Sequence, residues 1–454
     1  MFVGRKQELK AIRSVLGQKS GSVLVYGKRK VGKTTLILEA LKGNADKTVY
    51  YECLKSSLQD NIDSFVSALI AAQVLPVRLG FVSFQDVFGY LNTLPGTFNI
   101  VLDEYPYLKR FVAGETVDSI FQAVIDNHLS NIRLIISGSH IGMMKDLLEE
   151  KNALYGRFST VIRLTELNYK ESAAFYEEKS AYEKIAFYAV FGGSPFVNEQ
   201  LDAQSDLRMN IQELLLNPLS SVYAYADNLL LSDLSGSMNA ERIFSAIENG
   251  RKKYGEIESK LGLSNNGLLS KQLKKLLDMD LLAKRYPINR EDDSKKVSYE
   301  LTDNLLRFWF TYVYKNKGAL QMLGEEAFYE NYIAPTLITF IAHRFEEIAR
   351  TYFSIQVKEG SRKGILNIGT YYYDDSEHKT NGEFDVVLQK QDGYSVYEVK
   401  YLAAPLSEKA MQEEVKQIKA IKRIRVRDIG FISANNFEKE LPECECIDGE
   451  SMYK

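Results

Sequence analysis

The chain has 454 residues, of which 45% are hydrophobic and 26% are charged. At roughly 100 to 200 residues per domain, this length predicts about three domains. The composition is typical of a globular protein and excludes the collagen-like, disordered and disulfide-scaffold classes. Lysine and arginine number 57 against 60 aspartate and glutamate residues, and the net charge is −3. Any nucleic-acid binding must therefore come from local basic surfaces and not from a strongly basic chain.

Cysteine and histidine usage indicates neither a disulfide framework nor a structural zinc site. The three cysteines are Cys53, Cys444 and Cys446, and the four histidines lie far apart in the sequence. This usage fits a reducing compartment. The first residues lack the pattern of a signal peptide, and no run of about 18 apolar residues occurs. We therefore expect a cytoplasmic protein with no membrane contact.

Short apolar runs alternate with amphipathic segments in the first third of the chain. This alternation is typical of a parallel sheet covered by helices. The runs are rich in Val, Ile, Leu and Tyr, as buried parallel strands are. Strands are predicted at residues 23–26, 48–51, 98–102, 134–137 and 161–164. We expect an α/β core over residues 1–165.

A phosphate-binding loop follows the first predicted strand. The pattern G-x-x-x-x-G-K-[ST] is matched in full by Gly27, Lys28, Arg29, Lys30, Val31, Gly32, Lys33 and Thr34. Such a loop lets backbone N–H groups face the phosphates of a nucleotide. Lys33 is expected to reach the β and γ oxygens of ATP, and Thr34 to hold Mg²⁺. Thr35, at the start of the following helix, is counted with the nucleotide-binding residues.

Polar residues at the ends of two further strands complete the predicted nucleotide site. Asp103 is expected to hold Mg²⁺, and Glu104 to polarise the attacking water. Ser139 is expected to contact the γ-phosphate or that water, whereas Ser137 is interpreted as the end of its strand. Arg157 has two interpretations. It stabilises transition-state charge, in cis or in trans, or it is a surface arginine in a salt bridge.

Residues 166–238 predict a helical lid, interrupted at residues 192–195, and residues 239–315 predict a winged helix-turn-helix. The second prediction rests on three short helical patterns followed by two strand patterns around a polar stretch. Its third helix, predicted at 265–277 with Ser264 as N-cap, carries Ser270, Lys271, Gln272, Lys274 and Lys275. This helix either enters a DNA groove with its lysines near phosphates, or packs against another domain.

Residues 316–454 predict a small α/β domain with a helix around 341–352. Two alternating runs, 383–388 and 394–400, flank an Asp-Gly turn, which predicts a hairpin. A helix at 407–421 and a strand at 428–433 follow. The tyrosines at 371–373 are interpreted as strand and core residues rather than base-stacking platforms. Trp309, the single tryptophan, is interpreted as a buried anchor.

The hairpin carries acidic and basic residues at a spacing that allows metal-dependent chemistry. Glu398 and Lys400 point to one face because strand side chains alternate, and Asp385 on the partner strand can meet them. Asp385 and Glu398 would bind Mg²⁺, while Lys400 would steady a water or the developing phosphorane charge. Glu346 on the preceding helix is the expected extra acid, and Gln417 is a looser candidate. The alternative is a solvated hairpin with ordinary surface charges.

The chain carries two family resemblances, one in its N-terminal part and one in its C-terminal part. The segment FVGRKQEL at residues 2–9, the phosphate loop and the GGSP segment at 192–195 together resemble prokaryotic archaeal-type ATPases of the AAA+/STAND-like group. The resemblance implies that Arg5 and its neighbours lie by the adenine and that 192–195 lies in the lid. Ser194 stands where the family more often has an aliphatic residue.

The second stretch, LTDNLLRFWF at residues 301–310, followed by Phe345-Glu346 and Phe384-Asp385, resembles the DUF234-type region found on these ATPases. That region is itself similar to the PD-(D/E)xK restriction-endonuclease-like fold, which gives the D…E-x-K residues a nuclease role. The implied architecture is multidomain α/β: a P-loop parallel sheet with a helical lid, a winged helix and a nuclease-like domain.

These observations predict an ATP-binding and ATP-hydrolysing protein that acts on DNA through a winged helix and an Mg²⁺-dependent nuclease-like domain. The alternative is a nucleotide-gated switch or sensor, in which a non-cleaving C-terminal domain binds a protein or DNA partner. Self-association is compatible with both.

Overall fold

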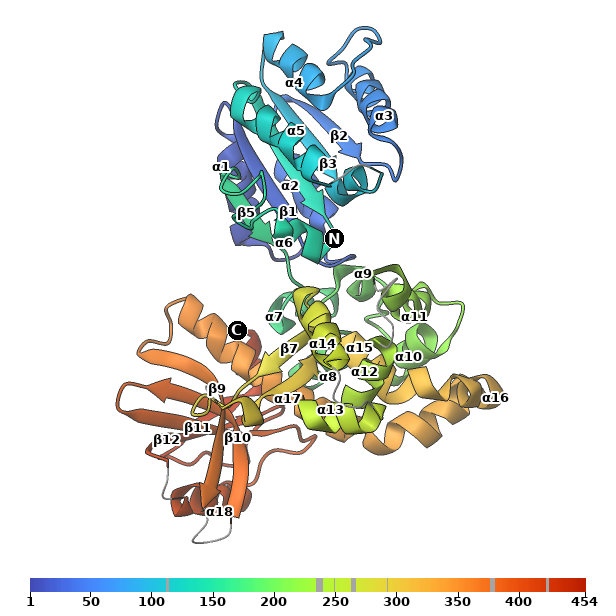
Figure 1. The fold of residues 1–454 in the computed structure, drawn as a ribbon. Coiled ribbons are helices and arrows are strands. Elements are labelled where there is room, and N and C mark those ends of the chain that lie inside the picture. Colours follow the sequence, from blue (N-terminus) through green and yellow to red (C-terminus); the bar gives the residue numbers. More distant parts are fainter. Residues whose placement is uncertain are drawn as a thin grey trace. The chain divides into compact units, whose positions relative to one another are not determined.

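The computed structural model describes residues 1–111, 114–233, 240–248, 250–262, 267–291, 293–375, 380–421 and 424–454. The chain forms two compact units (Figure 1). Unit 1 is Met1–Glu166 with Ser194–Phe196, and unit 2 is Leu167–Gly193 with Val197–Lys454. The division of unit 2 into a lid, a winged helix and a nuclease-like domain stays a prediction, and the proposed boundary at 238/239 falls outside the described residues.

Unit 1 is built on a five-stranded sheet in which every pairing is parallel. The strand order is β2 (Lys47–Glu52), β3 (Phe98–Asp103), β4 (Ile132–Gly138), β1 (Gly21–Tyr26) and β5 (Thr160–Arg163). The helices are α1 (Lys6–Leu16), α2 (Lys33–Leu41), α3 (Leu58–Ala71), α4 (Phe84–Thr93), α5 (Gly114–Asn127) and α6 (Ile141–Asp146). The predicted α/β fold class is confirmed.

The two faces of this sheet bury different residues because strand side chains alternate. Val23 and Val25 of β1 pack with α1 and α2 in one apolar cluster. Leu24 of the same strand packs in a second cluster with α3, α4 and α5. With both faces covered, the open edge at the carboxyl ends of the strands is where a site forms.

Unit 2 begins with helices and then turns to a small sheet. The first elements are α7 (Tyr169–Ser172), η2 (Ala173–Phe175), α8 (Ala181–Phe191), α9 (Pro195–Asn198), α10 (Leu207–Ile211), η3 (Gln212–Leu216) and α11 (Ser221–Asp233). After them come α12 (Ala240–Ile247), β6 (Lys252–Lys253), α13 (Tyr254–Leu261), α14 (Leu268–Asp278), β7 (Leu282–Arg285), η4 (Ser294–Lys296) and β8 (Ser298–Leu301). Strands β6, β8 and β7 form an antiparallel sheet in that order. The predicted N-cap Ser264 and the first residues of its helix lie outside the described residues.

The loop between β7 and β8 is held against the C-terminal sheet. The backbone N–H of Ile288 donates to the carbonyl of Thr370 at 2.7 Å. Asn289 bonds both backbone groups of Tyr372, at 2.7 and 3.1 Å. The ammonium of Lys296 lies 3.6 Å from the centre of the Tyr372 ring. This loop therefore extends the edge of the larger sheet.

A second helical stretch leads into the C-terminal sheet. It comprises α15 (Asn304–Phe308), η5 (Trp309–Val313), η6 (Tyr314–Asn316), α16 (Lys317–Phe328), η7 (Tyr329–Ile333) and α17 (Ala334–Lys358). Trp309 is 1% exposed, and its ring centre lies 4.8 Å from that of Tyr223 in α11. This burial agrees with an anchoring role.

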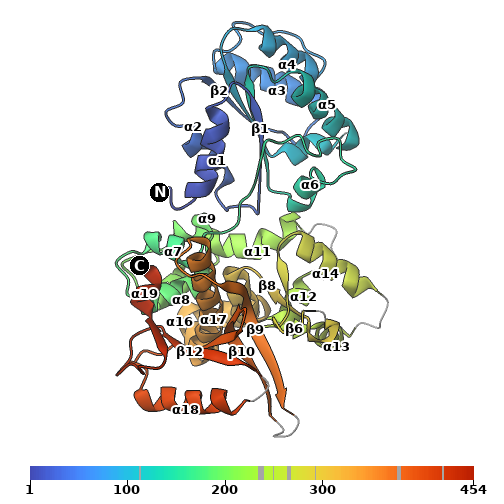
Figure 2. The same ribbon diagram turned by 90° about the vertical axis from the view of Figure 1, so that its left-hand side faces the viewer.

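The C-terminal sheet has the order β13, β12, β11, β10, β9 and is mixed. Its strands are β9 (Ile365–Asp375), β10 (Thr380–Lys390), β11 (Gly393–Lys400), β12 (Val426–Ser433) and β13 (Glu445–Asp448), with helices α18 (Glu408–Ala420) and α19 (Gly449–Tyr453). Strands β10 and β11 form the predicted antiparallel hairpin, with Lys390 opposite Gly393. Helix α17 packs on β9, β10 and β11 (Figure 2). The buried residues of α18 belong to the apolar cluster that holds Val387 and Val396.

Within the described ranges, no helix combines the length and the apolar character that crossing a membrane requires.

Candidate nucleotide site and acidic site

The phosphate loop lies between β1 and α2 in a conformation that needs its glycines. A Cβ atom on Gly27 would lie 2.1 Å from the carbonyl oxygen of Leu164, so no larger residue fits. Gly32 has φ 91° and Lys30 has φ 64°, both in the left-handed region. The loop from Gly27 to Gly32 curls around the start of α2. This geometry presents backbone N–H groups to an anion.

Lys33 is buried, with 6% of its surface exposed, and its ammonium lies inside the loop. The Nζ atom donates to the carbonyl oxygens of Gly27 and Lys28 at 3.1 and 2.9 Å, and to Ser139 Oγ at 2.9 Å. A buried ammonium with carbonyl and hydroxyl oxygens around it is suited to a phosphate anion close by. The predicted role of Lys33 toward phosphate oxygens fits this position.

Asp103 ends β3 and accepts four hydrogen bonds. The donors are Thr34 Oγ1 at 2.9 Å, the backbone N–H of Glu104 at 3.0 Å, and the hydroxyls of Tyr50 and Ser137. A carboxylate and a hydroxyl held together are the oxygen donors that Mg²⁺ takes alongside phosphate. Thr34 and Asp103 therefore fit the metal that the motif implies.

Sequence analysis did not predict a role for Tyr50, and it interpreted Ser137 only as the end of its strand. Tyr50 lies on β2, next to β3, and burial together with its bond to Asp103 raises the pKa of its hydroxyl far above 10. It therefore stays a donor. Ser137 does more than end its strand, since it bonds Asp103. The adjacent tyrosines Tyr50 and Tyr51 could have indicated this role. Side chains alternate along a strand, so their two rings lie on opposite faces of the sheet.

Glu104 and Ser139 lie together beside Lys33. Glu104 has φ 52°, and its carboxylate accepts hydrogen bonds from the Ser139 backbone N–H at 3.2 Å and from the Ser139 hydroxyl. Ser139 thus connects the ammonium of Lys33 with the carboxylate of Glu104. The structure brings all three predicted residues to one edge of the sheet.

Among the remaining predicted nucleotide-site residues, Arg5, Lys28 and Arg29 have partners within unit 1. Arg5 is buried and its guanidinium donates to the carbonyl of Thr165, while Lys28 lies 3.8 Å from Glu166. Arg29 donates to the Tyr107 hydroxyl at 3.3 Å. Thr35 is exposed.

Residues 194–196 contact the loop directly. Ser194 Oγ donates to the carbonyl of Lys30 at 3.2 Å, and the Lys30 ammonium lies 4.3 Å from the Phe196 ring centre. Pro195 lies 3.6 Å from the position that a Cβ on Gly32 would occupy. Serine at position 194, where the family more often has an aliphatic residue, thus supplies a hydrogen bond to the loop.

The structure contradicts an in-cis role for Arg157. Its Nε donates to both carboxylate oxygens of Asp126, at 3.0 and 3.1 Å. Its own carbonyl accepts from Ser22 Oγ at 2.7 Å. Ser22 lies at the start of β1, whereas the phosphate loop follows the end of that strand about 13 Å away. Arg157 therefore belongs to the opposite edge of the sheet and forms the salt bridge of its alternative interpretation.

The acidic site of unit 2 lies on the β10–β11 hairpin. Lys400 Nζ is bonded to Glu398 Oε1 at 2.7 Å and to Glu414 Oε1 of α18 at 3.0 Å. Gln417, the looser candidate on the same helix, is exposed. The helix residue that reaches Lys400 is therefore Glu414, which the sequence did not single out.

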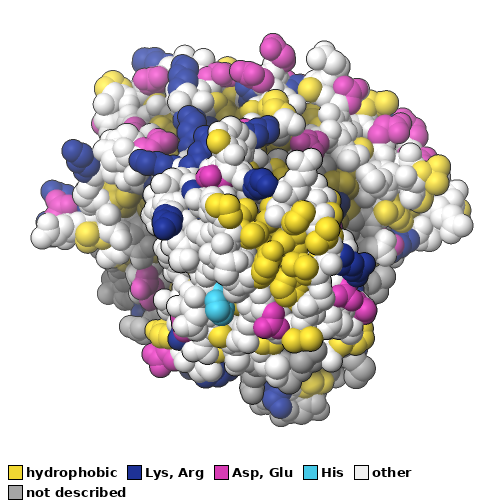
Figure 3. Space-filling view, turned by 90° about the horizontal axis from the view of Figure 1, so that it is seen from above, with side chains coloured by type: hydrophobic (Ala, Val, Ile, Leu, Met, Phe, Trp, Pro, Cys, Tyr) yellow, Lys and Arg dark blue, Asp and Glu magenta, His cyan; other side chains and the backbone are white. Residues whose placement is uncertain are grey.

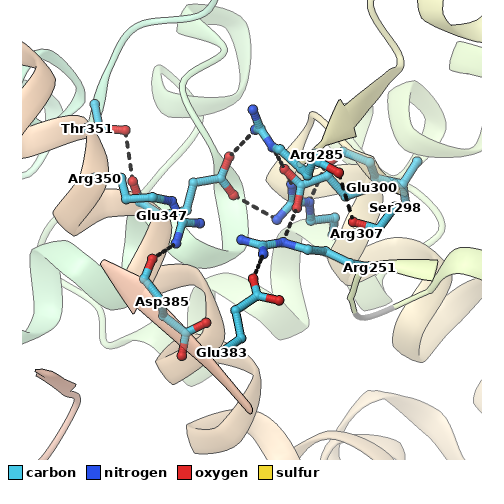
Figure 4. A network of polar contacts seen from close by, with 11 residues as sticks. Arg251, Arg285, Ser298, Glu300, Arg307, Glu347, Arg350, Thr351, Glu383 and Asp385 are labelled. Carbon is cyan, nitrogen blue, oxygen red and sulfur yellow. Dashed lines mark hydrogen bonds and ion pairs between the residues drawn. The ribbon is translucent and has the colours of Figure 1, made fainter. Parts of the chain in front are cut away.

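Asp385 lies at an irregularity in the pairing of β10 with β9, between Phe384 and Val387. Arg350 of α17 donates to its backbone carbonyl at 2.6 Å. Figure 4 shows the carboxylate of Asp385 directed away from this guanidinium. A bulge that turns a side chain out of register is common beside functional sites.

Glu346 shares the electrostatic environment of the hairpin acids. Burial, followed by the charge of Asp385, raises the pKa of Glu346 to about 8, and Glu398 adds to the rise. Burial also raises the pKa values of Asp385 and Glu398. Among the residues that the structure describes, however, no three or more acidic, histidine or cysteine side chains are grouped closely enough to hold a metal ion. The residues therefore offer the two carboxylates predicted for Mg²⁺, without a third.

Two families match the chain. Residues 2–201 match an ATPase domain predominantly from Archaea, and residues 309–418 match DUF234, archaeal and bacterial proteins of unknown function. The chain thus carries an archaeal-type P-loop ATPase domain in its N-terminal part and a DUF234 region in its C-terminal part.

One curated protein and one solved structure are similar to the chain over most of its length. An uncharacterized protein of Methanocaldococcus jannaschii is 28% identical over 383 residues, which cover 82% of each chain. The solved structure of a Walker-type ATPase of Pyrococcus abyssi is 17% identical with a TM-score of 0.51, and the match covers 68% of this chain and 96% of that one. At that identity the second similarity concerns the fold alone.

Proposed function

We propose that this ATPase binds Mg²⁺ with its nucleotide and acts on DNA through unit 2. The observation that carries the catalytic part is the connected set at the sheet edge, in which Thr34 bonds Asp103 and Ser139 joins Lys33 to Glu104. A P-loop nucleotide site needs a cation for the phosphates, oxygen ligands for Mg²⁺ and a carboxylate near the attacking water.

Each residue has a defined task in hydrolysis. Lys33 neutralises phosphate oxygens, and Thr34 with Asp103 holds Mg²⁺, which supplies charge stabilisation at the phosphates. Glu104 takes the proton of the attacking water, and Ser139 keeps that carboxylate in place. Tyr50 and Ser137 fix the orientation of Asp103 through their hydrogen bonds.

DNA contact is assigned to α14. Ser270, Lys271, Lys274 and Lys275 are exposed on this helix, whereas Gln272 is half-buried. Three helices followed by two antiparallel strands support a winged helix, and the loop between β7 and β8 is already held by β9. The helix, not the wing, is therefore the element available to a groove. Figure 3 shows acidic and basic side chains interspersed on one face of the molecule, in line with the near-neutral net charge. DNA contact at α14 therefore rests on its own lysines and is salt-dependent.

The chemistry on DNA is assigned to Asp385, Glu398 and Lys400, with Glu346 beside them. Asp385 and Glu398 would hold Mg²⁺, and Lys400 would stabilise the charge that develops on phosphorus-bound oxygens. The nuclease-like arrangement of a hairpin between α17 and α18 supports this assignment, as does the resemblance of residues 301–310.

The test is incubation of the full chain with plasmid, single-stranded and branched DNA in Mg²⁺ or Mn²⁺, with and without ATP. Cleavage that is lost in Asp385→Asn and in Lys400→Ala supports the proposal. The control variant is Gln417→Ala, which changes an exposed residue of the neighbouring helix and should cleave as the wild type does.

A second candidate is a nucleotide-gated switch whose unit 2 binds DNA, a protein or another copy of this chain without cleaving. Two observations favour it: Lys400 is held by two carboxylates, and the described residues hold no three-carboxylate cluster. Ser194–Phe196 contacts the phosphate loop and is continuous in sequence with α8, which offers a route for the signal. Salt-sensitive DNA binding without cleavage of any substrate would favour this candidate.

We also assign the protein to the cytoplasm, because Cys53, Cys444 and Cys446 are all free thiols, as expected in a reducing compartment.

A further inference from the structure

A basic pocket of about 510 Å³ lies in unit 2 between the loop after β7, helix α17 and strand β9. Its cationic lining residues are Arg251, Lys284, Arg285 and Arg350, and we use the name basic pocket for the cavity that they define. We propose that the basic pocket binds a phosphate ester of nucleotide size, either free or at the end of a nucleic-acid strand.

The charge balance of the pocket favours an anion. Arg251 and Arg285 are both paired with Glu300, Arg251 also with Glu383, and Arg285 also with Glu347 (Figure 4). Arg350 and Lys284 differ, since neither takes part in an ion pair among the described residues. Arg350 donates a hydrogen bond to the Asp385 carbonyl, and the carboxylates of Glu346 and Glu347 act on its charge without a direct ion pair. Two cations without an ion pair therefore face one cavity.

The lining holds four cationic side chains against two acids, Glu347 and Glu291. Despite its burial, Glu347 has a pKa lowered to about 2, because Arg307 and Arg285 stabilise its carboxylate. Its charge is therefore already matched outside the pocket by Arg307, at 2.9 Å. The other acid, Glu291, accepts a hydrogen bond from Asn367 at 2.7 Å.

The arginines of the lining suit an anionic ligand by their shape. A planar guanidinium offers paired N–H donors that match phosphate oxygens.

The size and the remaining lining residues define the ligand class. Pockets for small ligands span about 300–1,000 Å³, which includes a single nucleotide and excludes a duplex. Tyr286, Ile288 and Ile368 also line the pocket; Tyr286 is 37% exposed, and the two isoleucines are half-buried. These side chains provide apolar surface for a sugar or base beside the phosphate. The pocket is separate from the nucleotide site of unit 1, and its occupancy does not require cleavage at Asp385.

The test uses the full chain in a Lys33→Ala background, so that the phosphate loop is weakened as a competing site. A fluorescein-labelled 12-nucleotide single strand is titrated by anisotropy, followed by competition with unlabelled AMP and pyrophosphate. Lys284→Glu is the test variant because Lys284 is exposed and its replacement leaves the buried ion pairs intact. Lys284→Arg is the conservative variant, and Lys416→Glu on α18 is the matched charge control.

The expected result is binding that Lys284→Glu weakens by about tenfold or more, since a charge-assisted contact is lost, while Lys284→Arg and Lys416→Glu bind as the background does. Competition by pyrophosphate indicates that the phosphate is the recognised group. A strand that binds more tightly than AMP identifies a strand end as the ligand, and the reverse order identifies a free nucleotide. Equal binding by Lys284→Glu and Lys416→Glu, or no binding of the strand, AMP or pyrophosphate, would overturn the proposal.

Discussion

Replacing Arg307 by methionine tests how strongly the ion network of Figure 4 stabilises unit 2. Arg307 is 1% exposed and lies on α15. Its guanidinium donates to the carbonyl of Leu301, bonds Glu347 at 2.9 Å and lies 3.6 Å from Glu300. Arg307→Met keeps most of the buried stem and removes the charge.

The magnitude follows from what remains after the change. Removing one partner of a buried ion pair costs about 3 to 5 kcal/mol, because a charge is left uncompensated. Glu300 keeps Arg251 and Arg285, and Glu347 keeps Arg285. We therefore expect a loss near the lower end, about 3 kcal/mol, in the free energy of unfolding of unit 2.

Urea unfolding followed by tryptophan fluorescence measures this quantity for unit 2 alone. Trp309 is the single tryptophan of the chain and lies two residues after Arg307. The control is Arg425→Met, at an exposed position, which should change the unfolding free energy by less than about 0.5 kcal/mol. A loss below about 1 kcal/mol in Arg307→Met would refute the reasoning, since the network would then contribute no more than surface ion pairs do.

Three further predictions concern the two sites. Tyr50→Phe removes one donor to Asp103, and we expect half-maximal ATP turnover to need about tenfold more Mg²⁺; an unchanged Mg²⁺ requirement would contradict the role of Tyr50. Arg157→Ala should leave ATP turnover within about twofold of the wild type, because Arg157 lies at the far sheet edge; a large loss would contradict that placement. Glu346 has a pKa raised from 4.5 to about 8 by folding. The folded state therefore favours the protonated form of Glu346. The stability that this proton adds is fully present below pH 4.5 and is lost as the pH rises toward 8. The loss in the free energy of unfolding is at most about 5 kcal/mol. Melting in EDTA across this range should show the fall in wild type and a smaller fall in Glu346→Gln; parallel curves would count against the burial of this acid.

Local signals were enough to predict much of the fold. The phosphate loop, the five parallel strands and the β10–β11 hairpin each follow from short patterns of apolar, glycine and turn residues. Asp103 and Ser139 were predicted because parallel strands bring their carboxyl ends to one edge.

The remaining features depend on contacts between distant segments, which a single sequence does not specify. Tyr50 and Asp103 form a hydrogen bond although they are 53 residues apart in the sequence. Lys400 bonds Glu414 of α18, and the periodicity of that helix does not show which of its polar residues faces the hairpin. Arg157 was placed near the nucleotide because it follows β4 in sequence, but the chain returns to the start of β1 before β5. The docking of the β7–β8 loop on β9 is likewise a tertiary contact.

The most direct test of the central claim is ATP turnover by purified wild-type and Lys33→Ala chains in Mg²⁺. The structure predicts turnover in the wild type and a loss of at least about a hundredfold in Lys33→Ala, because the buried ammonium that faces the phosphates is removed. Turnover by Lys33→Ala equal to that of the wild type would contradict the assignment of the phosphate loop as the catalytic site.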